Sequence, residues 1–336
     1  MAITSGVRAP RAQVSIGGMT IEPITAHASQ EATKRSSTMS AMCALDDFGG
    51  DQFFGSLSDN SGSIMISGQT LCDGEWDHVG IDYDERVVRL SGRDKSAKLH
   101  EQKSSEKFKN QKRSEIVQTV AKRNGLTAQV DAGKLLAGKI EQIDWSKLTD
   151  GVSDAAILHK LAELEGARWW VKNGMLHFKS KSSGGGYSVQ YQAPSGSGPA
   201  TGNFLRLQIS LNLQAAKTLK CEVKSWHSKK KELIQASKSL NGNGGTLTYR
   251  YRSPGMEQDH ADDLALKKLA EHSRHELTIH VEMVGDPSID IGMGLQLQGT
   301  AFDQSYDMDR IDHTIGPSGH TMSIEARSAK QGREAQ

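Results

Sequence analysis

Hydrophobic residues stand at every second position through much of this chain, which is the spacing of a strand with one buried face. Residues 38–45 show it clearly, since every second residue from Met39 to Leu45 is apolar. Gly17-Gly18 separates two short apolar segments and predicts a tight hairpin turn. Several such segments up to Leu90 predict an antiparallel β-barrel. Its end is expected to be plugged by Phe48, Phe53 and Phe54.

The pattern changes along residues 87–99. We interpret Ser91-Gly92-Arg93-Asp94 as the exit turn of the last strand, because Ser and Asp bond nearby backbone groups and Gly adopts angles that other residues avoid. Residues 98–112 are highly charged, which is typical of a solvated surface. This stretch is therefore the expected seam between the first barrel and an inserted helical region.

Apolar residues at helical spacing predict two helices beyond the seam. The first is expected to be capped by Ser114 and to end at Gly125. The second is expected to begin at Ser153-Asp154 and to end at Gly166. The dipeptide Asn173-Gly174 then lies between two apolar segments and predicts a β-hairpin.

Residues 113–180 are thus interpreted as a small α+β insert, and 182–203, rich in Gly, Ser and Pro, as a linker or long loop. Alternation returns in residues 205–213, where Leu and Ile strictly alternate with polar residues, and continues in 219–223. Residues 257–274 predict a helix. The region is therefore expected to be a second barrel with one helix against it, so that the chain repeats barrel, insert, barrel.

Composition narrows the functional classes. The 336 residues carry 41 basic and 40 acidic side chains, a formal net charge of +1, whereas a nucleic-acid reader usually has a basic face. Cys43, Cys72 and Cys221 form no CxxC motif and are expected to be buried thiols in a reducing compartment. Neither a signal peptide nor a bilayer-spanning run is recognisable, so we expect synthesis in a cytoplasm.

Two groups of polar side chains could carry catalysis or bind a metal. The histidines lack a zinc-protease motif, although two share a helical face; they are His260, His272, His275 and His280. The aspartates lie in a strand–turn–strand stretch, where Asp commonly forms turns; they are Asp303, Asp307, Asp309 and Asp312, beside His313. We favour structural roles for both groups.

Two further motifs could bind phosphate. The Gly-rich segments 184–186 and 242–245 are not followed by the Lys-Ser/Thr pair of a phosphate-binding loop. Lys229-Lys230-Lys231 could contact phosphate or an acidic partner, but we favour an exposed turn. The sequence therefore predicts no catalytic, cofactor-binding or metal-binding residue.

Three groups of short motifs occur in a characteristic order along the chain. They are Leu90–Leu99 with the helix Glu115–Leu126; Ser153–Leu158 with Leu161–Glu163 and Asn173–Leu176; and Asp259–Ala270 with Gly292–Leu295, Ile311–His313 and His320–Ala326. In this order they resemble the late control protein D family of tailed phages, which are baseplate hub proteins of contractile tails. The likeness is greatest to the hubs of Mu-like and P2-like phages.

The resemblance implies a mainly β fold with an α+β insert. It implies two tail-tube-like β-barrels, flanked by helices and joined by a small helical region similar to a LysM module. The implied domains are the first barrel in residues 1–95, the insert in 96–195, the second barrel in 196–329 and a flexible tail in 330–336.

The resemblance also implies a structural role without enzymatic activity. A homotrimer with pseudo-sixfold symmetry would adapt a hexameric tail tube to a trimeric spike and leave a channel for DNA. Implied partners are the spike protein, the tail tube or tube-initiator hexamer, the baseplate wedge proteins, the tape measure protein and DNA that passes without sequence-specific binding. The implied location is the baseplate of the virion tail, after assembly in the cytoplasm of a bacterial host.

Two alternatives stay open at this point. The same fold serves as the hub of a contractile bacteriocin or a type VI-like secretion machine, which sequence does not separate from a phage hub. The LysM-like insert also allows a peptidoglycan-binding or peptidoglycan-hydrolysing tail protein. We favour docking over glycan binding for the insert, because the resemblance implies that such an insert is a docking platform in hubs. Hydrolysis would need a Glu/Asp or Cys/His pair, and no convincing pair stands out.

Overall fold

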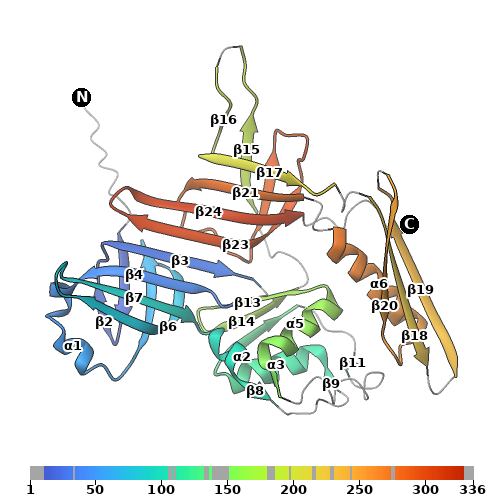
Figure 1. The fold of residues 1–336 in the computed structure, drawn as a ribbon, viewed down its shortest axis with the longest axis horizontal. Coiled ribbons are helices and arrows are strands. Elements are labelled where there is room, and N and C mark those ends of the chain that lie inside the picture. The colour runs from blue at the N-terminus through green and yellow to red at the C-terminus, as the bar shows by residue number, and fades with distance from the viewer. Residues whose placement is uncertain are drawn as a thin grey trace.

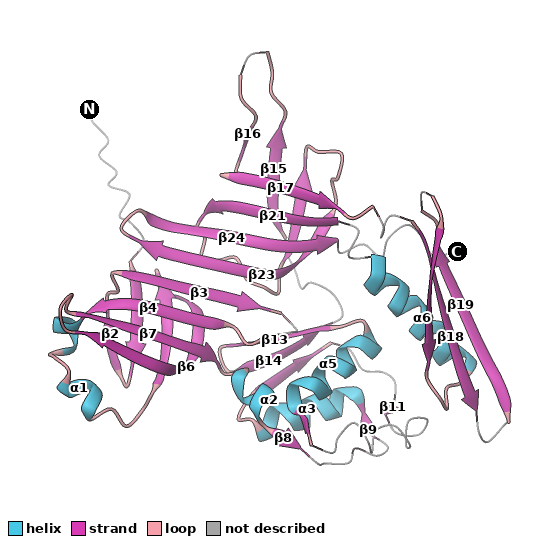
Figure 2. Ribbon diagram, in the orientation of Figure 1, coloured by secondary structure: helices cyan, strands magenta, loops and turns pink. Residues whose placement is uncertain are grey.

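A continuous sheet of 14 strands runs through most of the molecule in this computed structural model (Figure 1). Helices are few, and apart from α1 they gather on one side (Figure 2). No helix in the part of the chain that is described is long and apolar enough to cross a membrane. The structure describes residues 11–32, 35–104, 108, 111–131, 136–137, 151–179, 186–196, 198–213, 217–227, 231–242, 244–273 and 277–328.

The first seven strands form one half of this sheet in the order β2-β1-β5-β6-β7-β4-β3. Gly17 and Gly18 both have positive φ and make the predicted turn between β1 and β2. The alternation predicted for residues 38–45 is present, with Met39, Ala41 and Cys43 buried on β4. The strands are β1 (Ala12–Ile16), β2 (Met19–Ile21), β3 (Thr25–Glu31), β4 (Thr38–Ala44), β5 (Ser61–Ile66), β6 (Gln69–Asp82) and β7 (Val87–Asp94).

This half-sheet curls around a single apolar core. Val14 and Ile64 on one side and Val88 and Leu90 on the other belong to the same buried cluster. A 3-10 helix (Leu45–Phe48) and α1 (Gln52–Gly55) bring three phenylalanine rings against that core, with centroids 4.7 to 5.6 Å apart, as expected for a plug. The curl depends on β6, which pairs with β5 along its first part and with β7 along its second.

Glycines make the bend of β6 possible. Gly74 and Gly92 lie where β6 crosses onto β7, and a Cβ atom on Gly74 would stand 2.0 Å from the carbonyl oxygen of Arg93. A Cβ on Gly92 would stand 2.3 Å from the carbonyl oxygen of Glu75. Because both obstacles are backbone atoms, no side-chain movement can relieve them.

The other half of the sheet also has seven strands, in the order β16-β15-β22-β23-β24-β21-β17. Its core includes Ile279, Val281, Leu295 and Ile324, all buried. The two halves join where β23 pairs with β3. The strands are β15 (Tyr187–Gln192), β16 (Thr201–Gly202), β17 (Arg206–Leu211), β21 (Leu277–Val284), β22 (Gly294–Gln298), β23 (Ser305–Gly316) and β24 (Gly319–Ser328).

The two halves repeat one topology. Taken in chain order, β1 to β7 correspond to β15, β16, β17, β21, β22, β23 and β24, and each strand holds the same place in its half. One pairing differs in direction, since β1 and β5 are antiparallel whereas β15 and β22 are parallel. The predicted repeat is therefore present in the order of the strands.

The insert between the halves is α+β, as predicted. The Ser153 hydroxyl accepts the N–H of Ala156, and Gly166 ends that helix with φ of 61°. Asn173 and Gly174 both have positive φ at the hairpin turn. The elements are α2 (Ala97–Glu101), β8 (Lys103–Ser104), β9 (Gln111–Lys112), α3 (Arg113–Arg123), β10 (Thr127–Val130), β11 (Leu136–Ala137), β12 (Val152–Ser153), α5 (Asp154–Glu165), β13 (Arg168–Lys172) and β14 (Met175–Lys179).

A second insertion interrupts the second half between β17 and β21. It contains β18 (Thr218–His227), β19 (Glu232–Leu240), β20 (Thr246–Arg252) and α6 (Gln258–Ser273). The three strands form a sheet of their own, and α6 packs on β18 and β19. Buried residues of this unit, such as Val223 and Leu264, share one core with the α+β insert. The two insertions thus pack together outside the large sheet.

Four expectations from the sequence need correction. Ser91–Asp94, interpreted as an exit turn, are the last four residues of strand β7, where they pair with β6 and β4. Residues 187–192, within the expected linker, form β15, because Tyr187 and Val189 pack into the second core despite the Gly-rich flanks. Residues 219–223 belong to the separate sheet rather than to the second barrel, and α6 covers that sheet. The helix α3 is capped by Glu115, whose carboxylate accepts the N–H of Lys112 at 2.9 Å, and not by Ser114.

Two expected loose segments, the N-terminal arm up to residue 10 and the tail in 330–336, lie outside the described residues. The same holds for Lys229, Lys230 and His275.

We expect Gly74→Ala to lower the free energy of unfolding by about 2 kcal/mol or more, because overpacking against rigid backbone costs roughly this amount. Thermal or urea unfolding measures the change. Gly55→Ala is the matched control, since a Cβ there meets nothing within 4 Å. Equal stability of the two variants would contradict the role of Gly74 in the bend.

Candidate assembly interface

The joint between the two halves of the sheet is an antiparallel ladder. Six residue pairs align β23 with β3, from Arg310 opposite Glu31 to Ile315 opposite Ala26. At its centre His313 lies opposite Ala28, and both are completely buried. The pKa of His313 is lowered to about 3, chiefly because burial disfavours the charged ring. This face of the joint is therefore a dry, neutral contact.

Gln30 fastens the joint from the β3 side. Its side-chain amide donates to the carbonyl oxygen of Leu71 at 2.9 Å, and its side-chain oxygen accepts the N–H of Ile291 at 3.3 Å. Leu71 belongs to the first half of the sheet and Ile291 to the segment before β22 in the second half. A single buried side chain thus hydrogen-bonds both halves, and loss of either bond would leave a buried polar group unsatisfied.

Strand β13 fastens the joint from the insert. The guanidinium group of Arg168 is buried, donates to the carbonyl oxygen of Met308, and lies 3.6 Å from the carboxylate of Asp307 and 3.8 Å from that of Asp309. Trp169 points into the core of the insert, whereas Trp170 on the opposite face belongs to the core of the second half. Side chains on the two faces of this short strand therefore pack into two different cores, which attaches the insert to the sheet.

Gly292 leaves the space that the ring of Trp170 fills, since a Cβ there would stand 2.6 Å from it. The same ring stacks on His177 with centroids 5.0 Å apart. The ring of Trp170 is thus held by His177 of the insert and fits against Gly292 of the second half.

The hairpin β13–β14 also reaches the first half of the sheet. The N–H of Asn173 donates to Asp73 at 2.9 Å, and Lys95 pairs with the same carboxylate at 2.7 Å. Beside this contact lies a small cavity that Asp94 lines. Burial raises the pKa of Asp94 to about 7, although hydrogen bonds from Ser96 oppose the shift.

Two strand edges carry apolar residues without a partner strand among the described residues. Strand β17 pairs only with β21. Leu205, Leu211 and Leu213, on or next to β17, are 63 %, 43 % and 70 % exposed. Monomeric proteins seldom leave a long apolar edge open, because it can pair with another chain.

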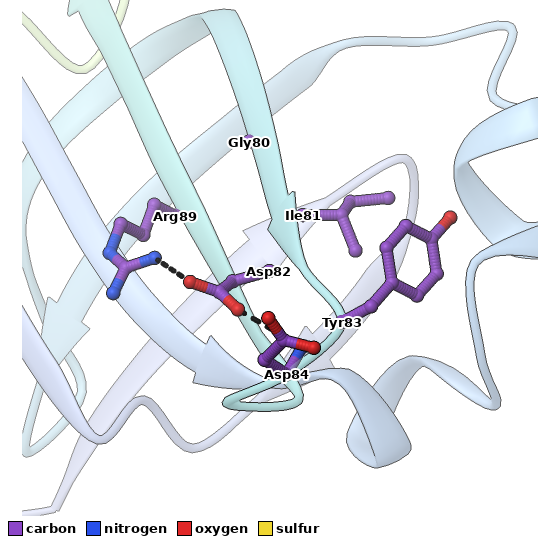
Figure 3. Close-up of a pocket in the computed structure, with 6 residues that line it drawn as sticks. All are labelled: Gly80, Ile81, Asp82, Tyr83, Asp84 and Arg89. Carbon is purple, nitrogen blue, oxygen red and sulfur yellow. Dashed lines mark hydrogen bonds and ion pairs between the residues drawn. The ribbon is translucent and has the colours of Figure 1, made fainter.

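The second open edge is the last part of β6. A shallow pocket lies along it, lined by Gly80–Asp84 and Arg89 (Figure 3). Arg89 pairs with Asp82 at 3.3 Å, and Asp82 also accepts the N–H of Asp84, so this end of the hairpin is held by its own polar groups. Ile81 is only half-buried, and Tyr83 is exposed.

The histidines named in the sequence have separate surroundings. His272 stacks on Tyr249 with ring centroids 3.7 Å apart, and its Nε2 is bonded to the Tyr251 hydroxyl at 2.5 Å. His280 faces Glu282 at 3.4 Å. No group of three or more potential metal ligands occurs among the described residues.

The aspartates hold the structure together. Asp303 accepts the N–H groups of Gly299 and Thr300, which lowers its pKa. Asp312 pairs with Arg310 at 2.8 Å. Asp307 and Asp309 surround Arg168, as described above. Of the two Gly-rich segments, Gly186, Gly242, Gly244 and Gly245 are described, and all four lie outside helices and strands. Lys231 is an exposed turn residue with φ of 52°.

Gln30 and Arg168 were not singled out from the sequence. A lone Gln in an Ala- and Ser-rich strand carries no recognisable signal. Arg168 follows a helix-ending glycine and precedes two tryptophans, which predicted a strand but gave no indication of its partner. The interface residues are thus set by tertiary contacts.

The model of the phage tail baseplate hub family matches residues 71–318. A comparison with curated protein sequences finds no match.

Solved tail proteins are similar in fold to this chain. A tail protein from Neisseria meningitidis MC58 has a TM-score of 0.68 at 15 % identity, over 95 % of this chain and 96 % of that one. The 43 kDa tail protein of prophage MuSo2 from Shewanella oneidensis has a TM-score of 0.71 at 14 % identity, over 96 % and 99 %. The E. coli c3393 protein, a component of the type VI secretion system, has 0.54 at 9 % identity, over 99 % and 78 %.

We expect Arg168→Ala to lower the free energy of unfolding by roughly 3–5 kcal/mol, because it removes a buried cation from beside Asp307 and Asp309 and takes the donor away from the carbonyl oxygen of Met308. Arg250→Ala is the control, since that exposed side chain pairs with Glu222 at 3.1 Å and a surface pair contributes about 1 kcal/mol or less. Urea unfolding of both variants measures the difference, and a loss at Arg168 no larger than at Arg250 would contradict the locking role.

Asp94 predicts a pH dependence that Asp94→Asn should remove. A folded pKa of about 7, above the ordinary value of 3.8, means that the folded state holds a proton that the unfolded state has lost. Stability from this group is therefore complete below about pH 4 and is lost as the pH rises through 7, by up to about 4 kcal/mol.

Unfolding of the wild type and Asp94→Asn at pH 4.5 and pH 8 tests this, since other titrating groups cancel in the comparison. The variant should gain stability relative to the wild type at the higher pH. An unchanged difference between the two pH values would rule the effect out.

Proposed function

The chain belongs to the phage tail baseplate hub family, and we propose that it is the central hub of a contractile phage tail, assembled as a homotrimer with pseudo-sixfold symmetry. The family is a structural component of phage tails, and the proposed role requires no catalysis. The trimer would mate with the hexameric tail tube on one side and with the trimeric spike on the other.

One observation supports this proposal above all. A single chain contains two curled half-sheets of the same strand order, joined edge to edge. Three copies of a chain with two such units present six of them around a ring, so a threefold assembly can match a sixfold one. Symmetry matching of this kind needs the repeat but no active site.

The charge balance suits a channel for DNA. A strongly basic wall would hold the phosphates of passing DNA, whereas the formal net charge of this chain is only +1. We accordingly expect DNA to pass through the channel without sequence-specific binding. We expect the baseplate itself to be assembled in the host cytoplasm.

The two insertions form a body that could dock other baseplate proteins. Lys267 of α6 donates to the carbonyl oxygen of Leu164 of α5 at 2.9 Å, and both helices share one core. On the outer face Trp226 and Leu233 lie opposite one another on β18 and β19, and both are more than half exposed. We propose that this surface binds the spike or the wedge proteins. The tail tube or tube-initiator hexamer and the tape measure protein would bind at the rim of the ring.

In this arrangement residues 11–94 carry the first ring unit, and residues 187–211 with 277–328 carry the second, which therefore begins before residue 196. Residues 97–179 form the docking insert, and residues 218–273 join it in the docking body.

The proposal predicts a particle with three times the 36.5 kDa mass of the chain. Native mass spectrometry of the purified full-length chain measures the mass, and negative-stain images should show rings with six lobes. A strict monomer over the micromolar range, both alone and mixed with its own spike protein, would contradict the proposal.

A further inference from the structure

The two halves of the sheet share an irregularity that aligns β6 with β23. The ladder between β6 and β7 skips Asp77, and the ladder between β23 and β24 skips Asp309. In each case the skipped aspartate pairs with an arginine on the neighbouring strand, Arg93 at 2.7 Å and Arg327 at 2.9 Å. A bulge closed by the same ion pair therefore marks equivalent positions in the two halves.

A shared hydrogen bond aligns β3 with β17. The N–H of Ile24 donates to the carbonyl oxygen of Met42 at 2.7 Å, and the N–H of Leu205 donates to that of Glu282, also at 2.7 Å. Both bonds precede strands with matching ladders to their neighbours. Counting from this bond, the β17 residues equivalent to Ala26, Ala28 and Gln30 of β3 are Leu207, Ile209 and Leu211.

The halves differ in what lies beside the bulged strand. Beyond its bulge, β23 pairs on one side with β24 and on the other with β3. Beyond its own bulge, β6 pairs with β7 on one side, and no described strand occupies the other. The position that β3 takes next to β23 is thus open next to β6, and β17, the equivalent of β3, has an open edge of its own.

We infer that β17 of a second copy of this chain pairs antiparallel with residues 77–83, which are the open edge of β6 up to Asp82 and the turn residue Tyr83 that follows it. Transferring the register of the internal joint places Val79 opposite Leu211, Ile81 opposite Ile209 and Tyr83 opposite Leu207. The inference rests on the proposed trimer and specifies the strands and register that build it.

The chemistry of the two edges matches. All the paired positions on this face are apolar or aromatic, and such cross-strand pairs stabilise a sheet. The equivalent residues of the internal joint are fully buried, among them Ile311, His313 and Ala28. Those of the open edges are half-buried or exposed, with Tyr83 at 63 % and Leu211 at 43 %.

The geometry also closes. Each copy offers one β6 edge and one β17 edge, so the contact is head-to-tail, and a closed ring pairs both of these edges in every copy. Because the same joint occurs once inside each chain, joints within a chain and joints between chains alternate around the ring. All half-sheets of the ring are then joined by equivalent strand pairs.

Cysteine cross-linking of the full chain tests both the partner and the register. Paired antiparallel residues have Cα atoms about 4.5–5.5 Å apart, within the range of a disulfide. The double variant Val79→Cys with Leu211→Cys should form a covalent trimer on mild oxidation, resolved on a non-reducing gel. A mixture of the two single variants should stop at a covalent dimer.

Two controls make the result decisive. Tyr83→Cys with Leu211→Cys uses the same face but is out of register by four residues, roughly 13 Å, and should not cross-link between chains. Tyr83→Cys with Leu207→Cys restores the register and should. Glu222→Cys with Ser237→Cys, opposite one another within β18 and β19, checks that oxidation is complete.

Native mass spectrometry before oxidation separates the possible failures. A trimer whose in-register pairs do not cross-link, while the Glu222–Ser237 control does, overturns the inferred joint and leaves the hub proposal standing. A protein that is monomeric before oxidation, both alone and mixed with its own spike protein, overturns the hub proposal itself. Equal cross-linking in and out of register overturns the inferred alignment.

Discussion

The antiparallel ladder between β3 and β23 is the contact on which the rest of the structure depends. It turns two curled half-sheets into one sheet of 14 strands. Several buried side chains constrain the surroundings of this ladder. Gln30 hydrogen-bonds both halves, Arg168 binds the insert to β23 at its bulge, and Trp170 packs the insert into the core of the second half. Removing a buried polar group from such a network costs more than the bond it makes, because its partner remains without water.

This constraint explains where the chain tolerates additional elements. One insertion follows β7 and the other follows β17, and neither interrupts the strands that meet at the joint. Both insertions instead share a core of their own, to which α5 and α6 contribute. The large sheet and the body formed by the two insertions are thereby separate, and β13 connects them.

Much of the local structure follows from the sequence, because short-range chemistry decides it. The Asn173-Gly174 turn, the Ser153 cap and the alternation on β4 all form as predicted. Strand β15 was missed because its Gly- and Ser-rich flanks dominate the composition, while its partner β22 lies about a hundred residues further on. The strands β18 to β20 alternate like barrel strands, and only α6 packing on them reveals a separate sheet. The alignment of the two halves could not be predicted from the sequence either. It depends on the registers of the strand pairs and on one ion pair that occurs in both halves, whereas most equivalent side chains differ.

The central claim is that one strand joint is used twice, once within the chain and once between chains. Hydrogen–deuterium exchange of the assembled particle tests it most directly, by comparing the backbone amides of residues 77–83 with those of residues 310–315. The account predicts that the amides of both segments exchange slowly in the particle. After dilution to monomer, exchange should become fast in residues 77–83 and stay slow in residues 310–315. Fast exchange of residues 77–83 in the intact particle, with residues 310–315 protected, would contradict it.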